Sequence, residues 1–245
     1  MPLQATERLY LQDDHCFEAG AMVIAIQEHR FALDRTCFYP GGGGQPADSG
    51  FATLPDGSHI EIESAFADED QIIWHVSRNA LSESLLGRPL TLHIDRERRI
   101  ALARYHTVLH VLNTITLRDY NGWITGVQIG EDYSRIDFNF ENFSVAMVTE
   151  LESKVNAVLQ EERTIQAYFI SEEEFQTRND LLRTLDVRPP VVNGRVRVVE
   201  IQGFDAQACG GTHVDSTHKV GRFTIFRTDN KGRKNKRLYV KLENT

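Results

Sequence analysis

The chain is poor in cysteine and has no long apolar run. Only three cysteines, Cys16, Cys37 and Cys209, occur among its 245 residues. A small, odd number of cysteines excludes a disulfide framework and favours a reducing compartment. No segment approaches the roughly 18 consecutive apolar residues of a membrane span, and the N-terminus has no basic and then apolar leader. We therefore expect a soluble, cytoplasmic protein with no membrane partner.

The remaining composition is that of an ordinary globular protein, with an uneven distribution of charge. Hydrophobic residues make up 41% and charged residues 25%, so the chain can form one large domain or two small ones. Residues 1–90 carry 5 Lys and Arg against 14 Asp and Glu, whereas residues 91–245 carry 22 against 21. The overall charge of −8 therefore does not exclude a nucleic-acid partner, because local patches set the affinity for phosphate.

Positive charge is concentrated near the C-terminus. The basic residues of this run are Lys231, Arg233, Lys234, Lys236, Arg237 and Lys241. The run is either a phosphate-binding patch or the solvated end of a hairpin, and composition alone favours the hairpin end.

Two residue pairs almost a hundred positions apart contain metal-ligand side chains. His106 and His110 are separated by three residues, and so are Cys209 and His213. Together they supply one thiolate and three imidazoles, a set that fits a tetrahedral zinc ion. Either pair alone is more often packed or solvated than ligating, but their joint occurrence predicts one shared metal site.

The sequence around each pair supports this prediction. Asp95 is a candidate N-cap, and residues 96–117 contain no Gly or Pro, so a helix is expected there. Two histidines at i and i+4 lie on one helix face, about 5–6 Å apart at Cβ. Gly210 and Gly211 allow the tight turn that brings His213 back toward Cys209.

The predicted secondary structure changes near residue 94. Before it, short strands separated by Gly, Pro, Asp and Asn indicate a small antiparallel barrel or sandwich. These strands are expected at residues 22–26, 30–33, 51–54, 59–63, 72–76 and 89–94. After residue 95 helices alternate with strands. Helices are expected at 96–117, 145–163 and 172–185, and strands at 127–129, 135–140, 195–201, 222–227 and 238–242.

One N-terminal segment, Gly41 to Gln45, contains four consecutive glycines. Such a segment exposes backbone N–H groups and allows another chain segment to come very close. It is not a P-loop, since the Lys-Ser/Thr ending is missing. The segment is therefore either a mobile inter-strand loop or a loop that contacts substrate or the second domain.

The common zinc hydrolase motifs do not fit. A zincin protease needs a glutamate directly after its first helix histidine, where this chain has Thr107. A zinc deaminase needs a Cys-x-x-Cys pair with a nearby glutamate, and the chain has neither. What is left is a structural four-ligand site or an unusual catalytic site.

The two pairs resemble the editing domain of alanyl-tRNA synthetases and of free-standing AlaX proteins. His106-Thr-Val-Leu-His110 and Cys209-Gly-Gly-Thr-His213 carry the resemblance. The resemblance extends to residues 95–99, which lead toward the histidine pair. It also includes Gln128 with the strand that follows it, and the glycine-rich segment. A related threonyl-tRNA editing domain usually has Pro before the last histidine, so Thr212 here favours the alanyl type.

The resemblance implies an α+β protein. A small N-terminal β-barrel with the glycine-rich loop (residues 1–92) would precede a zinc-containing editing domain of antiparallel sheet and packed helices (residues 93–245). The chain would hydrolyse mischarged tRNA(Ala), chiefly Ser-tRNA(Ala) and also Gly-tRNA(Ala). His106, His110, Cys209 and His213 would bind Zn²⁺, and Thr107 and Gln128 are expected near the substrate. The alternatives are a non-catalytic zinc-stabilised tRNA-binding module, a hydrolase for another acyl ester, and threonyl-type editing.

Overall fold

The computed structural model of the chain describes residues 3–139, 144–184, 188–232 and 235–243. It divides into two units. The first comprises Met1–Gly42 and Pro46–Arg99, and the second comprises Gly43–Gln45 and Ile100–Thr245. The tip of the glycine-rich loop therefore belongs to the second unit.

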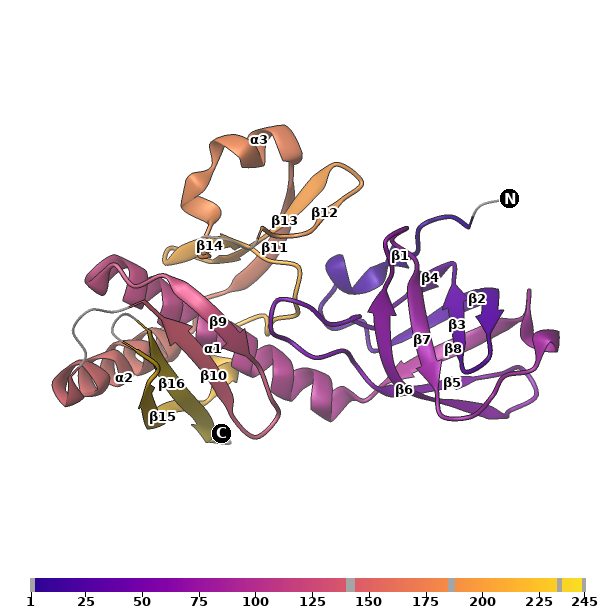
Figure 1. Cartoon of the computed structure of the whole chain (residues 1–245), viewed down its shortest axis with the longest axis horizontal. Coiled ribbons are helices and arrows are strands. Elements are labelled where there is room, and N and C mark those ends of the chain that lie inside the picture. The colour runs from indigo at the N-terminus through magenta and orange to yellow at the C-terminus, as the bar shows by residue number, and fades with distance from the viewer. Residues whose placement is uncertain (1–2, 140–143, 185–187, 233–234, 244–245) are drawn as a thin grey trace. The chain divides into compact units, whose positions relative to one another are not determined.

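Six antiparallel strands of the first unit close into a barrel in the order β2-β3-β7-β6-β5-β8 (Figure 1). In chain order they are β2 (Glu18–Gln27), β3 (Arg30–Leu33), β5 (Gly50–Thr53), β6 (His59–Ala67), β7 (Ile73–Ser77) and β8 (Pro89–Ile94). A short parallel pair, β1 (Glu7–Arg8) with β4 (Arg35–Thr36), lies outside it. The predicted small antiparallel β-barrel is confirmed.

Alternating side chains explain why these segments form strands. In β6, Ile60 and Ile62 are buried between exposed neighbours, as the two-residue period of a strand requires, and a register shift between Ile62 and Ser64 makes Ala65 the next buried residue. Gly50 allows β5 to approach β8 closely, because a Cβ there would lie 2.1 Å from the carbonyl oxygen of His93. The barrel is therefore filled by one face of each strand.

A buried ion pair in the first unit fixes the base of the glycine-rich loop. Arg99 donates from Nε to both carboxylate oxygens of Asp48, at 3.0 and 3.1 Å, and from Nη2 to the carbonyl of Cys37 at 2.8 Å. Asp48 in turn accepts from the backbone N–H of Tyr39 at 2.6 Å. Because Tyr39 and Asp48 flank the loop, this pair holds its two ends together.

The second unit consists of two sheets and three α-helices (Figure 1). One sheet has the order β15-β16-β10-β9, and in the other β13 pairs with β11, β12 and β14. The strands are β9 (Ile124–Gln128), β10 (Ser134–Phe138), β11 (Ile165–Ser171), β12 (Val191–Val192), β13 (Arg195–Ile201), β14 (Asp205–Ala208), β15 (Arg222–Asn230) and β16 (Lys236–Glu243). The helices are α1 (Arg96–Tyr120), α2 (Val145–Gln160) and α3 (Glu172–Thr177). With the barrel, this arrangement confirms the predicted α+β class.

Helix starts follow the capping residues in the sequence. The Asp95 carboxylate accepts from the N–H of Arg98, and the Ser144 and Ser171 hydroxyls accept from the N–H groups of Met147 and Glu174. Leu102, Val108, Leu112 and other residues of α1 are buried in a core shared with α2 and with β10, β15 and β16. This packing fixes the rotation of α1 about its axis.

Two features of the second unit differ from the sequence predictions. The helix predicted over residues 172–185 ends at Thr177, because Arg178 leaves helical geometry at φ −105° and ψ 66° and pairs with Asp180. Leu185 lies outside the described residues, as does residue 140 of the predicted strand 135–140. Strands β11, β12 and β14 were not predicted, since β12 has only two residues and the other two show no clear polar–apolar alternation. Among the described helices, none is long and apolar enough to cross a membrane.

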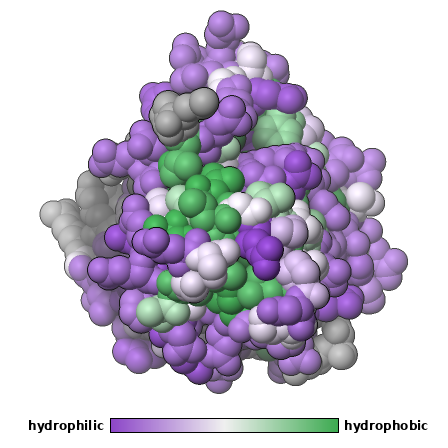
Figure 2. Space-filling view, turned by 90° about the vertical axis from the view of Figure 1, so that its right-hand side faces the viewer, coloured by the Kyte–Doolittle hydropathy of each residue, from purple (hydrophilic) through white to green (hydrophobic). Residues whose placement is uncertain are grey.

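Apolar side chains occur on the outer surface of the barrel as well as in its interior. Met22, Phe51 and Leu86 are large hydrophobic residues with substantial solvent exposure. Figure 2 shows hydrophobic residues gathered on one face of the molecule and surrounded by hydrophilic ones. Apolar patches of this kind are typical of contact surfaces.

The barrel should lose stability in mild acid because of one buried histidine. His75 is fully buried, accepts from the Thr36 hydroxyl at 2.8 Å, and has its pKa lowered to about 4 by burial. The unfolded chain binds a proton below pH 6.5, but the folded barrel does not until about pH 4. The free energy of unfolding should therefore fall across this range, by on the order of 3 kcal/mol.

Urea unfolding followed by Trp74 fluorescence, in a Trp123→Phe background, measures this dependence. His75→Gln should flatten the profile between pH 6.5 and 4, whereas substitution of the exposed His29 by Gln should leave it as in the parent. Equal slopes for the parent and His75→Gln would show that His75 is not the responsible group.

Candidate metal centre

Helix α1 places two histidines on one buried face. His106 and His110 are 7% and 6% exposed, and their ring centroids lie 5.0 Å apart. Their neighbours Tyr105, Leu109 and Val111 are buried in the core, so the helix cannot rotate to expose the imidazoles. The predicted helical pair is therefore present and directed inward.

The Cys209–His213 turn follows β14 and passes directly over the His106 ring. A Cβ on Gly211 would lie 2.2 Å from Cε1 of His106, so only glycine fits this position. Arg197, which is buried, donates from Nη1 to the carbonyls of Gly211 and Cys209 at 2.8 and 3.3 Å. Backbone geometry and one buried guanidinium thus fix the turn.

A side-chain amide joins β14 to α1 beside the cluster. Gln207 donates from Nε2 to the His110 carbonyl and to the Thr114 hydroxyl, and its Oε1 accepts from Asn113. These bonds are buried. They set the distance between His110 and the strand that leads into Cys209.

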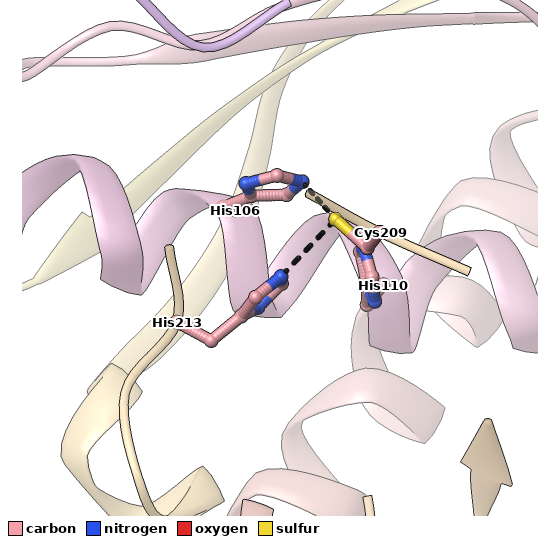
Figure 3. A group of neighbouring side chains, drawn as sticks. All are labelled: His106, His110, Cys209 and His213. Atoms are coloured by element: carbon pink, nitrogen blue, oxygen red, sulfur yellow. Dashed lines mark hydrogen bonds between the residues drawn. The ribbon is translucent and has the colours of Figure 1, made fainter. Parts of the chain in front are cut away.

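The four predicted side chains meet in the structure. One ligand atom from each of His106, His110, Cys209 and His213 lies within 4.8 Å of the others. The Cys209 Sγ lies 3.4 Å from Nε2 of His106 and 3.5 Å from Nε2 of His213 (Figure 3). The centroid of the His213 ring is 4.4 Å from that of each helix histidine. A set of nitrogen and sulfur donors this close together could hold a metal ion.

Burial keeps the imidazoles neutral. Burial, together with the positive charge of Arg197, lowers the pKa of His106 to about 3. Burial also holds the pKa values of His110 and His213 well below the ordinary range, with the neighbouring histidines and Arg197 adding to the effect. Neutral imidazole is the form that offers a lone pair to a metal.

Gln45 determines which nitrogen of His106 faces the cluster. Its Nε2 donates to the Thr212 hydroxyl at 2.8 Å, and its Oε1 accepts from the Thr212 N–H at 3.1 Å. The amide orientation is therefore fixed, so the contact at 2.8 Å between Oε1 and Nδ1 of His106 requires that Nδ1 donate. The lone pair then lies on Nε2, which faces Cys209 Sγ.

Thr107 lies beside the outer nitrogen of His213, as Gln45 does beside that of His106. Its side chain is fully buried, and its Oγ1 lies 3.1 Å from Nδ1 of His213 and accepts from the Val214 N–H at 3.3 Å. An Nδ1–H donated to Thr107 leaves Nε2 of His213 free toward Cys209 Sγ. Hydrogen bonds of this kind orient metal-ligating histidines and raise their basicity.

Gln128 lies elsewhere in the second unit. It is exposed on β9, and its Oε1 accepts from Nε of Arg135 at 2.7 Å. Within the described residues no hydrogen bond links it to the four clustered side chains. The expected contact between Gln128 and the substrate stays a prediction.

The sequence did not predict the roles of Gln45, Arg197 and Gln207 beside the cluster. The glycine-rich segment indicated that Gln45 lies where another chain segment comes close, but its partner Thr212 is 167 positions away. Arg197 gave no signal, because a basic residue within a strand ordinarily faces water.

Comparison with known proteins agrees with this geometry. Residues 196–239 match the family described as the threonyl and alanyl tRNA synthetase second additional domain, and residues 6–98 match the class II (A) tRNA synthetases. The fold and these two matches relate the chain to the alanyl and threonyl class of tRNA synthetases and their additional domains.

Similarity to individual proteins identifies the family more closely. The chain is 32% identical to the alanyl-tRNA editing protein AlaX-M of Saccharolobus solfataricus over 238 residues, which is 96% of this chain and 98% of that protein. It is 34% identical to AlaX-M of Methanosarcina acetivorans over 97% of this chain and 99% of that protein. The alanine–tRNA ligase of Pyrococcus furiosus is 33% identical over 93% of this chain, which spans 25% of the ligase. The chain belongs to the AlaX-M family of alanyl-tRNA editing proteins.

Removing the Gln45 amide should weaken metal binding without unfolding the second unit. Gln45→Ala leaves Nδ1 of His106 and the Thr212 backbone without their partner, so metal affinity should fall by about 10- to 100-fold. Competition with a chromophoric chelator measures this. Gln166→Ala, an exposed glutamine on β11 paired with Glu200, is the matched control and should bind as the parent does. Equal affinity of the Gln45 and Gln166 variants would contradict the orienting role.

The hydroxyl of Thr107 can be tested with a pair of substitutions. Thr107→Val keeps the shape but removes the hydrogen-bond acceptor for His213, and should lower metal affinity about tenfold or more. Thr107→Ser keeps the hydroxyl and should bind nearly as the parent does. If Val and Ser variants bind metal alike in the chelator assay, the contact with His213 does not position that ring.

Proposed function

We propose that this chain is a trans-editing hydrolase that removes the wrong amino acid from mischarged tRNA(Ala) in the cytoplasm. The chief substrate is Ser-tRNA(Ala), and Gly-tRNA(Ala) is the second. One observation carries the proposal: three imidazoles and one thiol converge at one point in a chain that matches alanyl-tRNA editing proteins over nearly its whole length.

Zn²⁺ is the metal that this donor set fits best. Zinc bonds of about 2.0–2.1 Å to nitrogen and 2.3 Å to sulfur, at tetrahedral angles, place the two donor atoms roughly 3.5 Å apart. The observed distances from Cys209 Sγ to the two Nε2 atoms, 3.4 and 3.5 Å, agree with this value. Imidazole and thiolate ligands together also favour zinc over calcium or magnesium, which prefer oxygen.

Burial indicates the side from which substrate reaches the cluster. The three histidines are buried, whereas Cys209 is partly exposed. The aminoacyl ester therefore approaches past Cys209, while Gln45 and Thr107 hold the His106 and His213 rings from behind. A zinc ion held by these four side chains would supply Lewis-acid chemistry to the ester when one ligand gives way or the shell expands to admit it. Gln128 is proposed to contact the RNA end of the substrate from the outer face of β9.

Selectivity against Ala-tRNA(Ala) follows from hydrogen bonding. A synthetase pocket shaped for alanine cannot strongly reject serine or glycine, so a second site must remove them. A site that hydrogen-bonds the serine hydroxyl leaves buried polar groups unpaired when alanine enters, and this spares the correct product.

The proposal is tested by metal content and deacylation measured together. His110→Ala removes one ligand, so bound zinc and hydrolysis of Ser-tRNA(Ala) should be lost in parallel. His218→Ala, a histidine exposed elsewhere in the second unit, should keep one zinc per chain and full activity. The panel should include Gly-tRNA(Ala), Ala-tRNA(Ala) and Ser-tRNA(Thr).

Three outcomes would contradict the proposal. Release no faster than in buffer, with tRNA still bound, would indicate a binding module without catalysis. Faster hydrolysis of Ser-tRNA(Thr) would indicate editing of the threonyl type. Full activity in a His110→Ala protein without metal would remove the role of the cluster.

A further inference from the structure

The outer face of the β15-β16-β10-β9 sheet carries a row of side chains that crosses all four strands. Cross-strand pairing places Gln128 beside Arg135, Arg135 beside Tyr239, and Tyr239 beside Arg227. The side chains of the opposite face, such as Ile136, Leu238 and Val240, are buried in the core. The row therefore faces away from the core.

Three aromatic rings gather on this outer face. The ring centroids of Tyr133, Phe226 and Tyr239 lie 6.0 to 6.3 Å from one another. Tyr133 and Phe226 are 49% and 48% exposed, so about half of their surface lies in water. An irregularity in pairing between Ile225 and Arg227 places Phe226 among the outward-facing residues. Rings exposed in this way gain stability when a flat apolar surface covers them.

Cations surround the rings. The Arg227 guanidinium lies 4.7 Å from the Tyr239 ring centroid, and Lys241 Nζ lies 5.1 Å from that of Phe226. Arg135 and Lys231 add two more positive charges, and Lys231 approaches Asp229 at 3.6 Å. This face thus combines flat apolar surface with positive charge.

Two carboxylates in the middle of this face, those of Asp137 and Asp229, are already paired. Asp137 accepts two hydrogen bonds from Arg237 at 2.7 and 2.8 Å. Asp229 accepts from Arg227 and from the Tyr239 hydroxyl. These carboxylates are 11% and 21% exposed, so among the described side chains of the sheet face the accessible charge is mainly positive. Glu131 and Asp132 precede Tyr133 in the turn, which makes that edge acidic.

This row ends close to the segment that orients the metal cluster. Ile129, directly after Gln128, donates its N–H to the Gly44 carbonyl at 2.8 Å, and Gly44 packs on Val127. The next residue, Gln45, bonds to His106. With strands about 4.8 Å apart, the row extends roughly 14 Å from Gln128 to Arg227. A few stacked nucleotides span such a length.

We infer that this face, defined by Tyr133, Phe226, Tyr239, Arg135, Arg227 and Lys241, binds the unpaired 3′ end of the tRNA. The inference rests on the proposed function. Bases stack on the exposed rings and on the Arg227 guanidinium, while Lys241 and Arg135 contact phosphates. Aromatic rings interleaved with cations match a single-stranded nucleic acid, which has flat bases and negative phosphates, better than they match an apolar protein surface.

Binding of uncharged RNA tests the inference independently of hydrolysis. The probe is a fluorescein-labelled hairpin of the tRNA(Ala) acceptor stem with its unpaired 3′ end, compared with the same hairpin made blunt. The parent protein should bind the overhang hairpin more tightly. Phe226→Ala and Tyr239→Ala should each weaken that binding by about tenfold and leave binding of the blunt hairpin unchanged.

Matched variants separate the roles of rings and charges. Tyr239→Phe keeps the ring and should keep the affinity. Lys241→Gln should reduce the dependence of log Kd on log salt by about 0.7, while the ring variants leave that slope unchanged. Phe169→Ala, which removes a ring beside Arg195 on the other sheet, should bind as the parent does.

Several results would overturn the inference. These are unchanged affinity in both alanine variants, an equal loss for overhang and blunt hairpins, or a loss in Phe169→Ala as large as in Phe226→Ala. A change in sedimentation without a change in RNA affinity would identify the face as an interface between copies of the chain. A protein that binds the overhang through the rings but releases no serine would keep this inference and contradict the proposed hydrolase.

Discussion

The close approach of a glycine turn to one face of a helix is the constraint on which the rest of the site depends. His106 and His110 lie one helical turn apart, and the turn at Gly211 passes so near the His106 ring that no side chain fits there. Burying three imidazoles and a thiol together is unfavourable unless each finds a partner. The structure keeps the imidazoles neutral by burial and directs two Nε2 atoms at the same sulfur.

Hydrogen bonds behind the cluster make that geometry specific. Gln45 accepts from the outer nitrogen of His106, Thr107 is hydrogen-bonded to the outer nitrogen of His213, and Arg197 holds the carbonyls of the turn. The glycine-rich segment is thus more than a flexible connection, because Gly44 packs on Val127 and Gln45 reaches His106. A metal ion held here would depend on residues that never touch it.

Much of this organisation could be predicted from the sequence wherever a local pattern exists. The alternation in β6, the cap at Asp95 and the spacing of His106 and His110 are local, and the structure has each of them. Strands β11 and β14 were missed because their side chains are not clearly sorted by polarity. The partners of Gln45 could not be predicted, since its bond to His106 spans 61 positions and depends on how the segments pack. The row of side chains across the outer sheet face could not be predicted either, because the register between strands is set only when the chain folds.

The central claim, that these four side chains bind one zinc ion, is tested most directly by X-ray absorption at the zinc edge of the purified chain. The account predicts one zinc per chain with three nitrogen ligands at about 2.0–2.1 Å and one sulfur ligand at about 2.3 Å. A protein that contains no metal, or a metal shell without sulfur, would contradict it.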